Sequence, residues 1–404
     1  MKLAKKKIGI ICEGKIPPDS RVSVVPVQCH LIQESHPDVE IEVQSSDVRC
    51  FEDKEFEARG IRVVKEVSDC DILLGVKEVP VEQLVTEKTY LFFSHTIKKQ
   101  PHNRKLLQEV IKKKIRLIDY ECLTDEKGIR VIAFGRWAGI IGAHNGLYTW
   151  GKKTGKLLLK RVIEYKDFAE LKENYRAIIV PPLRIIITGD GRVANGCVEV
   201  MELLKIKRVS PEDYLRNSFH DAVYAQLSPR DIYTHQSGKK FDLQEFFAKP
   251  QNFDCDFKRW YRQTDLMLNA IFWDPRAPRY FTLEEMRSPD FKIKAIADIS
   301  CDINGSVPAT LRATTIAEPV MGYDPVKQID VAPFQPNTID IMAIDNLPNE
   351  LPRDASESFG EIMTHIVIPE LLKPHSEMIE RATIAKDGNL MARFEYLGDY
   401  LERK

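Results

Sequence analysis

The sequence contains no apolar run long enough to cross a membrane and no excess of charge of either sign. A membrane-spanning helix needs roughly 20 consecutive apolar residues, and no stretch approaches that length. The 59 basic and 60 acidic residues leave a net charge of −1, so no global field attracts nucleic acid or anionic membranes. The first apolar run, residues 8–12, is too short for the core of a signal peptide. We therefore expect a cytoplasmic protein without membrane or nucleic-acid partners.

The sequence also lacks the residue spacings that hold metal ions. Its 8 cysteines are scattered and form no Cys-x-x-Cys pair, which in a chain of this length is typical of reduced thiols rather than of a disulfide framework or a zinc site. Its 9 histidines show no His-x-x-x-His spacing. We expect no bound metal.

Short apolar runs alternate with polar, helix-compatible stretches over the first 135 residues. This rhythm is typical of βα units around a parallel sheet, and a second series begins after the double proline at 181–182. A chain of 404 residues exceeds one ordinary core. We predict an α/β fold with two Rossmann-like parallel-sheet domains and a cleft between them. The first comprises residues 1–140 plus about 350–404, and the second residues 141–349 with an irregular insertion near 214–265.

The expected elements follow from these patterns. Small residues such as Gly139 and Gly142 favour a tightly packed helix running from Trp137 to Val162. A helical pattern covers residues 357–372, and two β-capable runs between 382 and 397 follow it, joined by a turn at 386–389. Strands are expected at 8–12, 41–43, 61–64, 72–74, 90–93 and 115–118, and then at 183–188, 266–272, 295–299 and 339–344.

Two apolar runs of the first domain each end in a basic residue. Residues 72–76 lead into Lys77, and residues 90–94 lead into His95. Because ligands of open parallel sheets bind outside the carboxyl ends of the strands, we expect Lys77 and His95 to form an acid/base pair. One such residue alone is more often solvated or capping than catalytic. Charged residues also follow the other strands of this domain, among them Glu13, Lys15, Lys98, Asp119 and Glu121.

A G-x-G-x-x-A motif at 189–194 follows a predicted strand and precedes a predicted helix. Gly189 would make a tight turn, and Gly191 would let the backbone approach a pyrophosphate at the helix N-terminus. This placement favours a dinucleotide site over a merely tight turn.

The next strand of the second domain ends in Ser210 instead of an acidic residue that would hold a ribose hydroxyl. Lys205, Lys207 and Arg208 surround it, which suits a 2′-phosphate and favours NADP over NAD. Two acidic residues at 212 and 213 keep NAD open.

Seven segments resemble the L-lysine-forming saccharopine dehydrogenases, and in particular lysine-ketoglutarate reductase, the reductase half of the bifunctional animal and plant enzymes. These proteins share a superfamily with alanine dehydrogenase and transhydrogenase. The resemblance implies NAD- or NADP-dependent interconversion of saccharopine with L-lysine and 2-oxoglutarate, and it is weakest near 214–265. The segments are GVKEVP (75–80), KTYLFFSHTIK (88–98), RLIDYE (116–121), RVIAFG (130–135), LNAIFW (268–273), DISCD (298–302) and IDNLP (344–348).

The resemblance also implies roles for individual residues. Lys77 and His95 match the acid/base pair, and Val193 stands where fungal members carry a cysteine. The residues matching substrate-binding or tuning positions are Lys15, Arg21, Glu78, Lys98, Glu121 and Arg130. Those expected to hold the cofactor are Gly189, Gly191, Arg192, Val193, Ser210, Phe272, Asp298, Ser300, Asp345 and Leu347.

Other functions fit part of the same evidence. A related amino-acid or opine dehydrogenase, such as an alanine dehydrogenase, would share the fold and the glycine loop. A noncatalytic binding protein would need neither Lys77 nor His95. An isolated lysine has a pKa about three units above neutrality, so a catalytic Lys77 needs a lowered pKa, and Glu78 beside it would act in the opposite direction. The sequence leaves the oligomeric state open.

Overall fold

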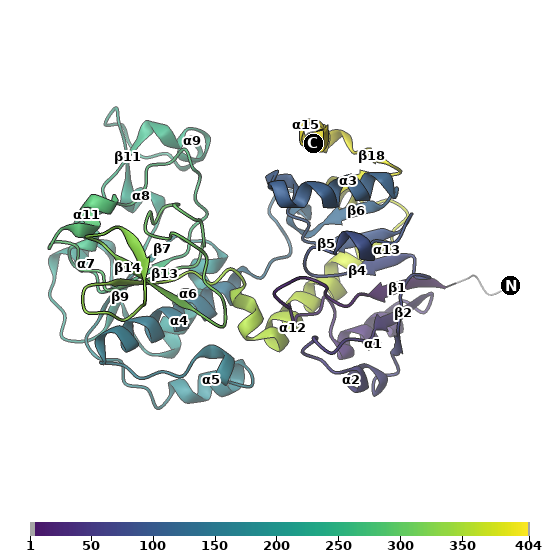
Figure 1. Cartoon of the computed structure of the whole chain (residues 1–404), viewed down its shortest axis with the longest axis horizontal. Helices are drawn as coiled ribbons and strands as arrows, with labels where there is room; N and C mark the ends of the chain where they lie inside the picture. Colours follow the sequence, from purple (N-terminus) through teal and green to yellow (C-terminus); the bar gives the residue numbers. More distant parts are fainter. Residues whose placement is uncertain (1–4, 403–404) are drawn as a thin grey trace. The chain divides into compact units, whose positions relative to one another are not determined.

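The chain folds into two α/β units in a computed structural model that describes residues 5–402 (Figure 1). One unit is formed by Met1–Phe134 with Pro352–Lys404, and the other by Gly135–Leu351. Each contains an eight-stranded, mostly parallel sheet. The predicted α/β class with two parallel-sheet domains is therefore confirmed. Within the described residues, no helix combines the length and the apolar character that crossing a membrane requires.

The sheet of the first unit has the strand order β3-β2-β1-β4-β5-β6-β17-β18. Strands β1 to β6 are parallel, and β17 joins β6 antiparallel. The order reverses between β1 and β4, where open α/β sheets bind their ligands. The strands are β1 (Lys6–Ile10), β2 (Val39–Gln44), β3 (Arg62–Val64), β4 (Ile72–Leu74), β5 (Thr89–Phe92), β6 (Arg116–Asp119), β17 (Thr383–Lys386) and β18 (Asn389–Leu390).

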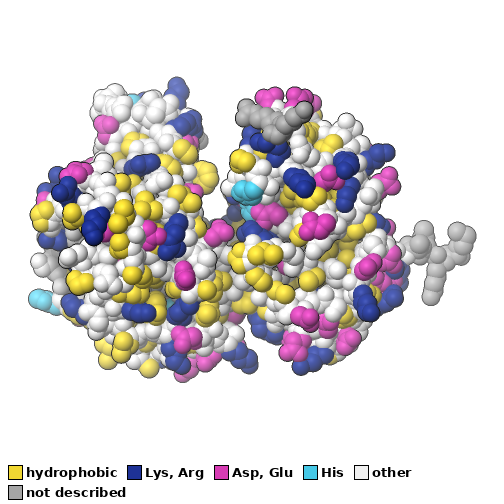
Figure 2. All heavy atoms as spheres, in the orientation of Figure 1, with side chains coloured by type: hydrophobic (Ala, Val, Ile, Leu, Met, Phe, Trp, Pro, Cys, Tyr) yellow, Lys and Arg dark blue, Asp and Glu magenta, His cyan; other side chains and the backbone are white. Residues whose placement is uncertain are grey.

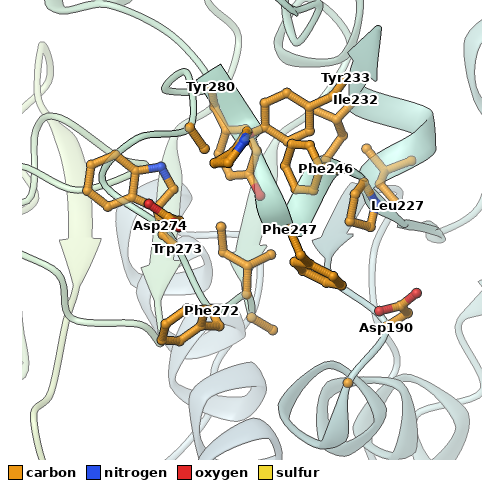
Figure 3. Close-up of a pocket in the computed structure, with 17 residues that line it drawn as sticks. Asp190, Leu227, Ile232, Tyr233, Phe246, Phe247, Phe272, Trp273, Asp274 and Tyr280 are labelled. Carbon is orange, nitrogen blue, oxygen red and sulfur yellow. The ribbon is translucent and has the colours of Figure 1, made fainter. Parts of the chain in front are cut away.

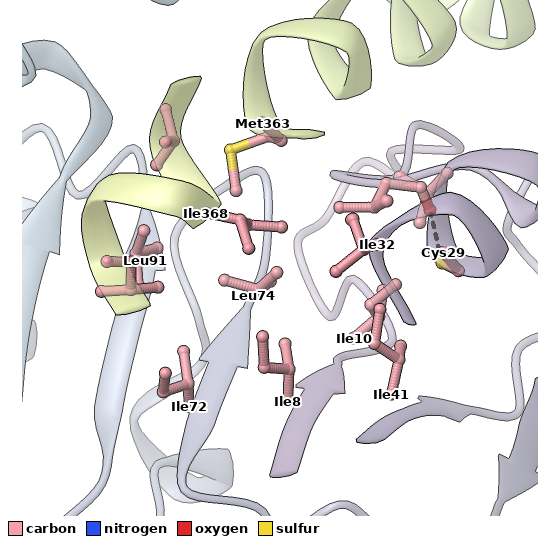
Figure 4. Close-up of a cluster of buried hydrophobic side chains, with 14 of the residues drawn as sticks. Ile8, Ile10, Cys29, Ile32, Ile41, Ile72, Leu74, Leu91, Met363 and Ile368 are labelled. Atoms are coloured by element: carbon pink, nitrogen blue, oxygen red, sulfur yellow. Dashed lines mark hydrogen bonds between the residues drawn. The ribbon is translucent and has the colours of Figure 1, made fainter. Parts of the chain in front are cut away.

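Helices bury both faces of this sheet, which explains why its strands read as continuous apolar runs. On one face, Ile8 and Leu74 pack with Ile32 of α1 and with Met363 and Ile368 of the C-terminal segment (Figure 4). The other face is covered by α3 and the C-terminal residues 394–400. The helices are α1 (Pro26–Ser35), α2 (Asp53–Glu57), α3 (Arg104–Lys112), α12 (Pro352–Ile362), a π-helical turn (Met363–Val367), α13 (Ile368–Leu372), α14 (Glu377–Ala382) and α15 (Gly398–Glu402).

The sheet of the second unit has the order β8-β9-β7-β12-β13-β16-β14-β15, in which β14 pairs antiparallel with both β16 and β15 and the other pairs are parallel. Its strands are β7 (Arg184–Thr188), β8 (Lys207–Arg208), β9 (Val223–Leu227), β12 (Leu266–Asn269), β13 (Ala295–Asp298), β14 (Val320–Asp324), β15 (Ile329–Val331) and β16 (Ile339–Met342). Its helices are α4 (Gly135–Thr154), α5 (Phe168–Tyr175), α6 (Arg192–Leu203), α7 (Pro211–Arg216), α8 (Pro229–Ile232), α9 (Leu243–Ala248), α10 (Lys258–Tyr261) and α11 (Leu283–Arg287).

The segment 214–265 is not simply an irregular insertion, and that prediction was wrong. It contains β9, which lies inside the sheet and pairs in parallel with both β7 and β8. Val223, Tyr224 and Ala225 are buried on this strand. The strand is five residues long and stands among polar residues, so its apolar signal is short. The rest of the segment forms short helices and the ribbon of β10 (Tyr233–His235) and β11 (Phe253–Cys255).

Three other elements differ from the expected ones. Helix α4 ends at Thr154 instead of near 162, because Gly155 takes a left-handed φ of 69° that stops the helix. Strand β12 ends at Asn269, so Phe272 lies on the loop that follows. The second C-terminal β run is only β18, and residues 392–397 form a 3-10 helix.

Basic and acidic side chains are interspersed over the face of each unit shown in Figure 2. The two signs of charge are thus not segregated on that face.

Helices α4 and α6 pack backbone to backbone. A Cβ atom on Gly139 would lie 1.9 Å from the carbonyl oxygen of Val193, and one on Gly196 would lie 2.2 Å from that of Arg136. Both positions therefore require glycine, and Gly139 fulfils the expectation of close packing. This contact fixes α6, the helix that follows the glycine loop, against its neighbour.

We expect Gly139→Ala to lower the free energy of unfolding by about 1–3 kcal/mol or more, because the added methyl group has no room against backbone atoms. The measurement is urea unfolding followed by circular dichroism. Gly398→Ala is the matched control, since no atom lies within 4 Å of the place its added methyl group would take and α15 accepts alanine. Equal unfolding midpoints for the two variants would contradict the packing argument.

Candidate active site and dinucleotide-binding loop

Charged residues gather at the carboxyl edge of the first unit's sheet. Glu13 follows β1, Lys77 follows β4, His95 follows β5 and Glu121 follows β6. These strands are neighbours, in the order β1-β4-β5-β6, so their ends lie along one edge. The parallel topology thus places the two expected bases on adjacent strands, at the position where such sheets bind ligands.

Glu78 connects His95 to Lys15. Its Oε1 lies 2.5 Å from Nδ1 of His95, and its Oε2 lies 3.2 Å from Nζ of Lys15. Burial alone would raise the pKa of Glu78, but the hydrogen bond and charge of His95, with Lys15, outweigh it and lower this pKa to about 2. The carboxylate therefore stays ionised and orients the imidazole. The Glu78 carboxylate contacts His95 and Lys15, although Glu78 directly follows Lys77 in the sequence.

The backbone and a neighbouring ring also position His95. Its φ of 52° is left-handed, which turns the chain sharply after β5. The imidazole stacks on Phe93, with ring centroids 6.2 Å apart. Behind it, Asp119 accepts hydrogen bonds from the N–H and the hydroxyl of Ser94 and from the N–H of Glu121, and so ties the ends of β5 and β6 together. Burial raises the pKa of Asp119.

Glu121 forms a second cluster with two of the expected substrate-binding cations. Its Oε1 lies 3.2 Å from Nζ of Lys98 and 3.4 Å from Nη1 of Arg130. Lys98 is exposed and Arg130 is partly buried. The structure therefore brings Lys98, Glu121 and Arg130 together, as it does Lys15, Glu78 and His95.

Arg21 is held by a partner that sequence reasoning missed. Its guanidinium donates to both carboxylate oxygens of Asp19, at 3.0 and 2.6 Å, and lies 4.2 Å from the ring centre of Phe134. It is only 3% exposed. A ligand carboxylate at Arg21 would therefore share the guanidinium with Asp19.

Glu13 is the other residue whose place in the site was not foreseen. Its two carboxylate oxygens accept the backbone N–H groups of Val76 and Lys77, at 2.6 and 2.9 Å. Burial raises the pKa of Glu13 to about 8, although these two donors act in the opposite direction. Its position directly after β1 was visible in the sequence, but nothing there showed that it bridges to the end of β4. Glu13 thereby fixes the backbone that carries Lys77.

The glycine loop of the second unit has the geometry expected of a phosphate-binding turn. Gly189 has a φ of 100°, and a Cβ there would lie 2.7 Å from the carbonyl oxygen of Ala270. Above Gly191 the space is open, so a side chain would fill room that a phosphate needs. The 12-residue helix α6 begins at Arg192 without a side-chain cap on Gly191, which leaves its first N–H groups for an anion.

An apolar cavity of about 410 Å³ adjoins this loop. Figure 3 shows the aromatic rings around it, which come from α9 and from the segments after β9 and β12. Phe272 is 92% exposed at its rim, on the β12 loop. Gly189, Gly191 and Phe272, three of the expected cofactor-binding residues, line this one cavity, together with Tyr233, Phe246, Phe247, Trp273 and Tyr280.

The other residues expected to bind cofactor lie elsewhere in the unit. Asp298 is fully buried and accepts hydrogen bonds from Asn269, Ser300 and Thr310 at 2.6–2.8 Å, so it braces the ends of β12 and β13. Burial raises the pKa of Asp298. Arg192 and Asp345 are exposed, Val193 is partly buried, and Leu347 is buried.

Ser210 does not occupy the ribose position expected from its place in the chain. It follows β8, which is separated from β7 by β9. Its hydroxyl accepts the N–H of Asp213 at 3.0 Å and so caps α7. The cause is the strand order: β8 follows β7 in the chain, but β9 is the neighbour of β7 in the sheet.

One group of possible metal ligands occurs among residues 5–402, formed by Glu42, Asp69 and Cys70. Lys7 lies 3.2 Å from Glu42 and 2.6 Å from Asp69, and Arg62 lies 2.9 Å from Glu42. These cations already compensate the two carboxylates.

Comparison with known proteins relates both units to dehydrogenases. Residues 9–141 match the family model of the alanine dehydrogenase/PNT N-terminal domain. The chain is 30% identical to the mitochondrial alpha-aminoadipic semialdehyde synthase of Mus musculus, over 88% of this chain and 44% of that protein. It is 27% identical to the synthase of Arabidopsis thaliana, over 98% of this chain and 42% of that protein. The chain thus spans less than half the length of these relatives.

A relative of similar length and two solved structures extend the comparison. Saccharopine dehydrogenase [NAD(+), L-lysine-forming] of Emericella nidulans is 26% identical over 92% of both chains. The fold is similar to that of an L-alanine dehydrogenase, with a TM-score of 0.64, 14% identity and coverage of 98% of this chain and 99% of that one. It is also similar to a transhydrogenase from Sinorhizobium meliloti, with a TM-score of 0.60, 11% identity and coverage of 96% and 99%.

The raised pKa of Glu13 predicts a pH dependence of stability. Above its usual pKa of 4.5 the unfolded chain loses this proton, whereas the folded chain keeps it until about pH 8. The folded state then binds more protons, so Glu13 lowers stability progressively as pH rises from about 4.5 to about 8. We expect Glu13→Gln to remove this decline, which is at most about 1.4 kcal/mol per pH unit.

Urea unfolding between pH 5 and pH 9 measures the effect. Glu126→Gln, an exposed loop residue, is the control and should follow the wild-type profile. Parallel profiles for wild type and Glu13→Gln would show that Glu13 titrates normally.

Proposed function

We propose that this chain interconverts saccharopine with L-lysine and 2-oxoglutarate. The premise is that the chain belongs to the L-lysine-forming saccharopine dehydrogenase family within the alanine dehydrogenase and transhydrogenase superfamily. In the oxidative direction, saccharopine, NAD(P)⁺ and water give L-lysine, 2-oxoglutarate, NAD(P)H and a proton. The observation that carries this proposal is the series Lys15, Glu78 and His95, joined by an ion pair and a hydrogen bond, beside Lys77 at the sheet edge.

The chemistry requires proton transfers at three stages. The secondary amine loses a proton as its carbon loses hydride, water adds to the resulting imine, and the departing amine of lysine gains a proton. His95 suits these transfers because an imidazole can both accept and donate a proton through its ring nitrogens. Its Nδ1 faces Glu78, which leaves Nε2 to exchange protons with the substrate. We assign the remaining transfers to Lys77, whose backbone Glu13 fixes.

Saccharopine and its products carry several carboxylates, which match the cations around His95. Lys15, Arg21, Lys98 and Arg130 are candidates to bind them, since lysine and arginine form charge-assisted hydrogen bonds with carboxylates. Each cation already has an acidic neighbour, namely Glu78, Asp19 or Glu121. A ligand carboxylate would therefore replace or share the acidic partner of a cation, because none of these cations lacks such a partner.

The second unit would hold the dinucleotide through Gly189, Gly191 and the first N–H groups of α6, beside the aromatic cavity. When bound, the dinucleotide accepts or supplies the hydride. We propose NADP as the preferred form, with NAD as the alternative. The cytoplasmic location inferred from sequence stays a prediction, and the rodent relatives are mitochondrial by name.

A related amino-acid dehydrogenase is the second candidate function. It rests on the fold shared with an L-alanine dehydrogenase, because a common fold does not determine the substrate. Oxidation of reduced cofactor with pyruvate and ammonia, but not with lysine and 2-oxoglutarate, would favour it.

The direct test follows NADPH and NADH absorbance with L-lysine and 2-oxoglutarate. We expect Lys77→Met and His95→Gln each to lower kcat by roughly 100-fold or more, as for loss of a general acid or base. Lys112→Met, which changes an exposed lysine on α3, is the control and should retain the wild-type rate. Unchanged rates in both site variants would refute the acid/base assignment, and no turnover with any amine and keto acid would refute the enzyme.

A further inference from the structure

Strand β9 changes which residue lies beside the glycine loop. In the usual dinucleotide-binding order, the strand after the first helix is the neighbour of the first strand and carries the ribose-binding acid at its end. Here that neighbour is β9, and β8 is displaced to the edge. Leu227 of β9 is in register with Thr188 of β7, and its carbonyl accepts the N–H of Gly189 at 2.8 Å. The residue level with the glycine loop is therefore Ser228.

No acidic side chain is offered to a ribose at this position. Ser228 donates both its N–H and its hydroxyl to Oδ2 of Asp231, at 2.8 and 2.6 Å. Asp231 is thus turned toward Ser228, where the pair closes the first turn of α8. A bare 2′-hydroxyl would lack the free carboxylate acceptor that NAD-binding proteins supply here.

Two arginines occur near this position in the fold, Arg208 on the adjacent strand β8 and Arg230 in the first turn of α8. Arg208, exposed on β8, donates to the amide oxygen of Gln226 at 2.9 Å, and the amide nitrogen of Gln226 donates to the carbonyl of Gly189 at 3.1 Å. Two hydrogen bonds thus connect the guanidinium of Arg208 to the phosphate-binding turn. Arg230, two residues after Ser228, is exposed and has no hydrogen-bond or ion-pair partner among residues 5–402.

We propose that Arg208, which is connected to the glycine loop through Gln226, and Arg230, two residues after Ser228, bind the 2′-phosphate of NADP and so determine the choice of dinucleotide. The inference rests on the proposed function only in requiring that the glycine loop bind a dinucleotide. A guanidinium matches a phosphate in geometry and charge, and a neutral serine removes the repulsion that an acid would exert on it. The position that selects the cofactor lies at the end of β9, about 40 residues beyond the glycine loop, because β8 and α7 intervene in the chain.

The test measures binding of NADPH and of NADH to the full chain by fluorescence titration, without lysine or 2-oxoglutarate. We expect wild type to bind NADPH more tightly. Arg208→Ala and Arg230→Ala should each weaken NADPH binding by roughly 10-fold or more and leave NADH binding nearly unchanged, since a charge-assisted contact is lost only with the phosphate. Ser228→Asp should shift the preference toward NADH.

Arg287→Ala is the matched control, because it removes an exposed arginine from α11 and should leave both affinities unchanged. An unchanged NADPH-to-NADH ratio in both arginine variants would overturn the proposal and would assign the ribose to an acid such as Asp190 or Asp231. An equal loss of both dinucleotides in Arg208→Ala would show that Arg208 merely positions Gln226, and would overturn its part. Selective NADPH binding without lysine turnover would support this inference and refute the proposed reaction, whereas failure to bind either dinucleotide would refute both.

Discussion

The architecture depends on the burial of both faces of each parallel sheet. A strand covered on both sides has no place for an unpaired charge, so polar groups can be exposed only at its ends. In the first unit, Ile8, Leu74 and Leu91 fill the interior of the sheet, and Glu13, Lys77 and His95 follow the same strands. The separation of apolar runs from charged ends therefore both stabilises the sheet and concentrates acids and bases along one edge.

Charge pairing governs how that edge is organised. Three clusters pair basic with acidic side chains: Lys15 and His95 with Glu78, Lys98 and Arg130 with Glu121, and Arg21 with Asp19. Side chains held this way keep their positions without a ligand, which reduces the ordering that binding requires. The Glu78 carboxylate, although it follows Lys77 in the chain, is engaged by His95 and Lys15. Adjacent residues in the chain need not be partners in the site.

Sequence patterns were sufficient where the structure depends on local order. Apolar runs located β4 and β5, and the residues after them located Lys77 and His95. They were insufficient where the structure depends on which strands become neighbours. Glu13 accepts hydrogen bonds from the backbone after β4, which is 64 residues away in the chain for Lys77. Ser210 lies away from the glycine loop because β9 is placed between β7 and β8. Strand pairing is a long-range property, and a five-residue strand among polar neighbours carries too little periodicity to reveal it.

The two units share one architecture but differ in the loop that follows the first strand, and this loop determines which groups are available at the sheet edge. In the second unit, β7 is followed by Gly189 and Gly191, whose backbone leaves open space before the N-terminus of α6. In the first unit, β1 is followed by Glu13, whose carboxylate occupies the N–H groups at the end of β4. A pyrophosphate would compete with that carboxyl group for the same two N–H donors, and its binding would leave a partly buried acid without hydrogen-bond partners. The two loops thus fit the proposed division of roles, in which the edge of the first unit carries the acid/base residues Lys77 and His95 and the glycine loop of the second unit binds the dinucleotide.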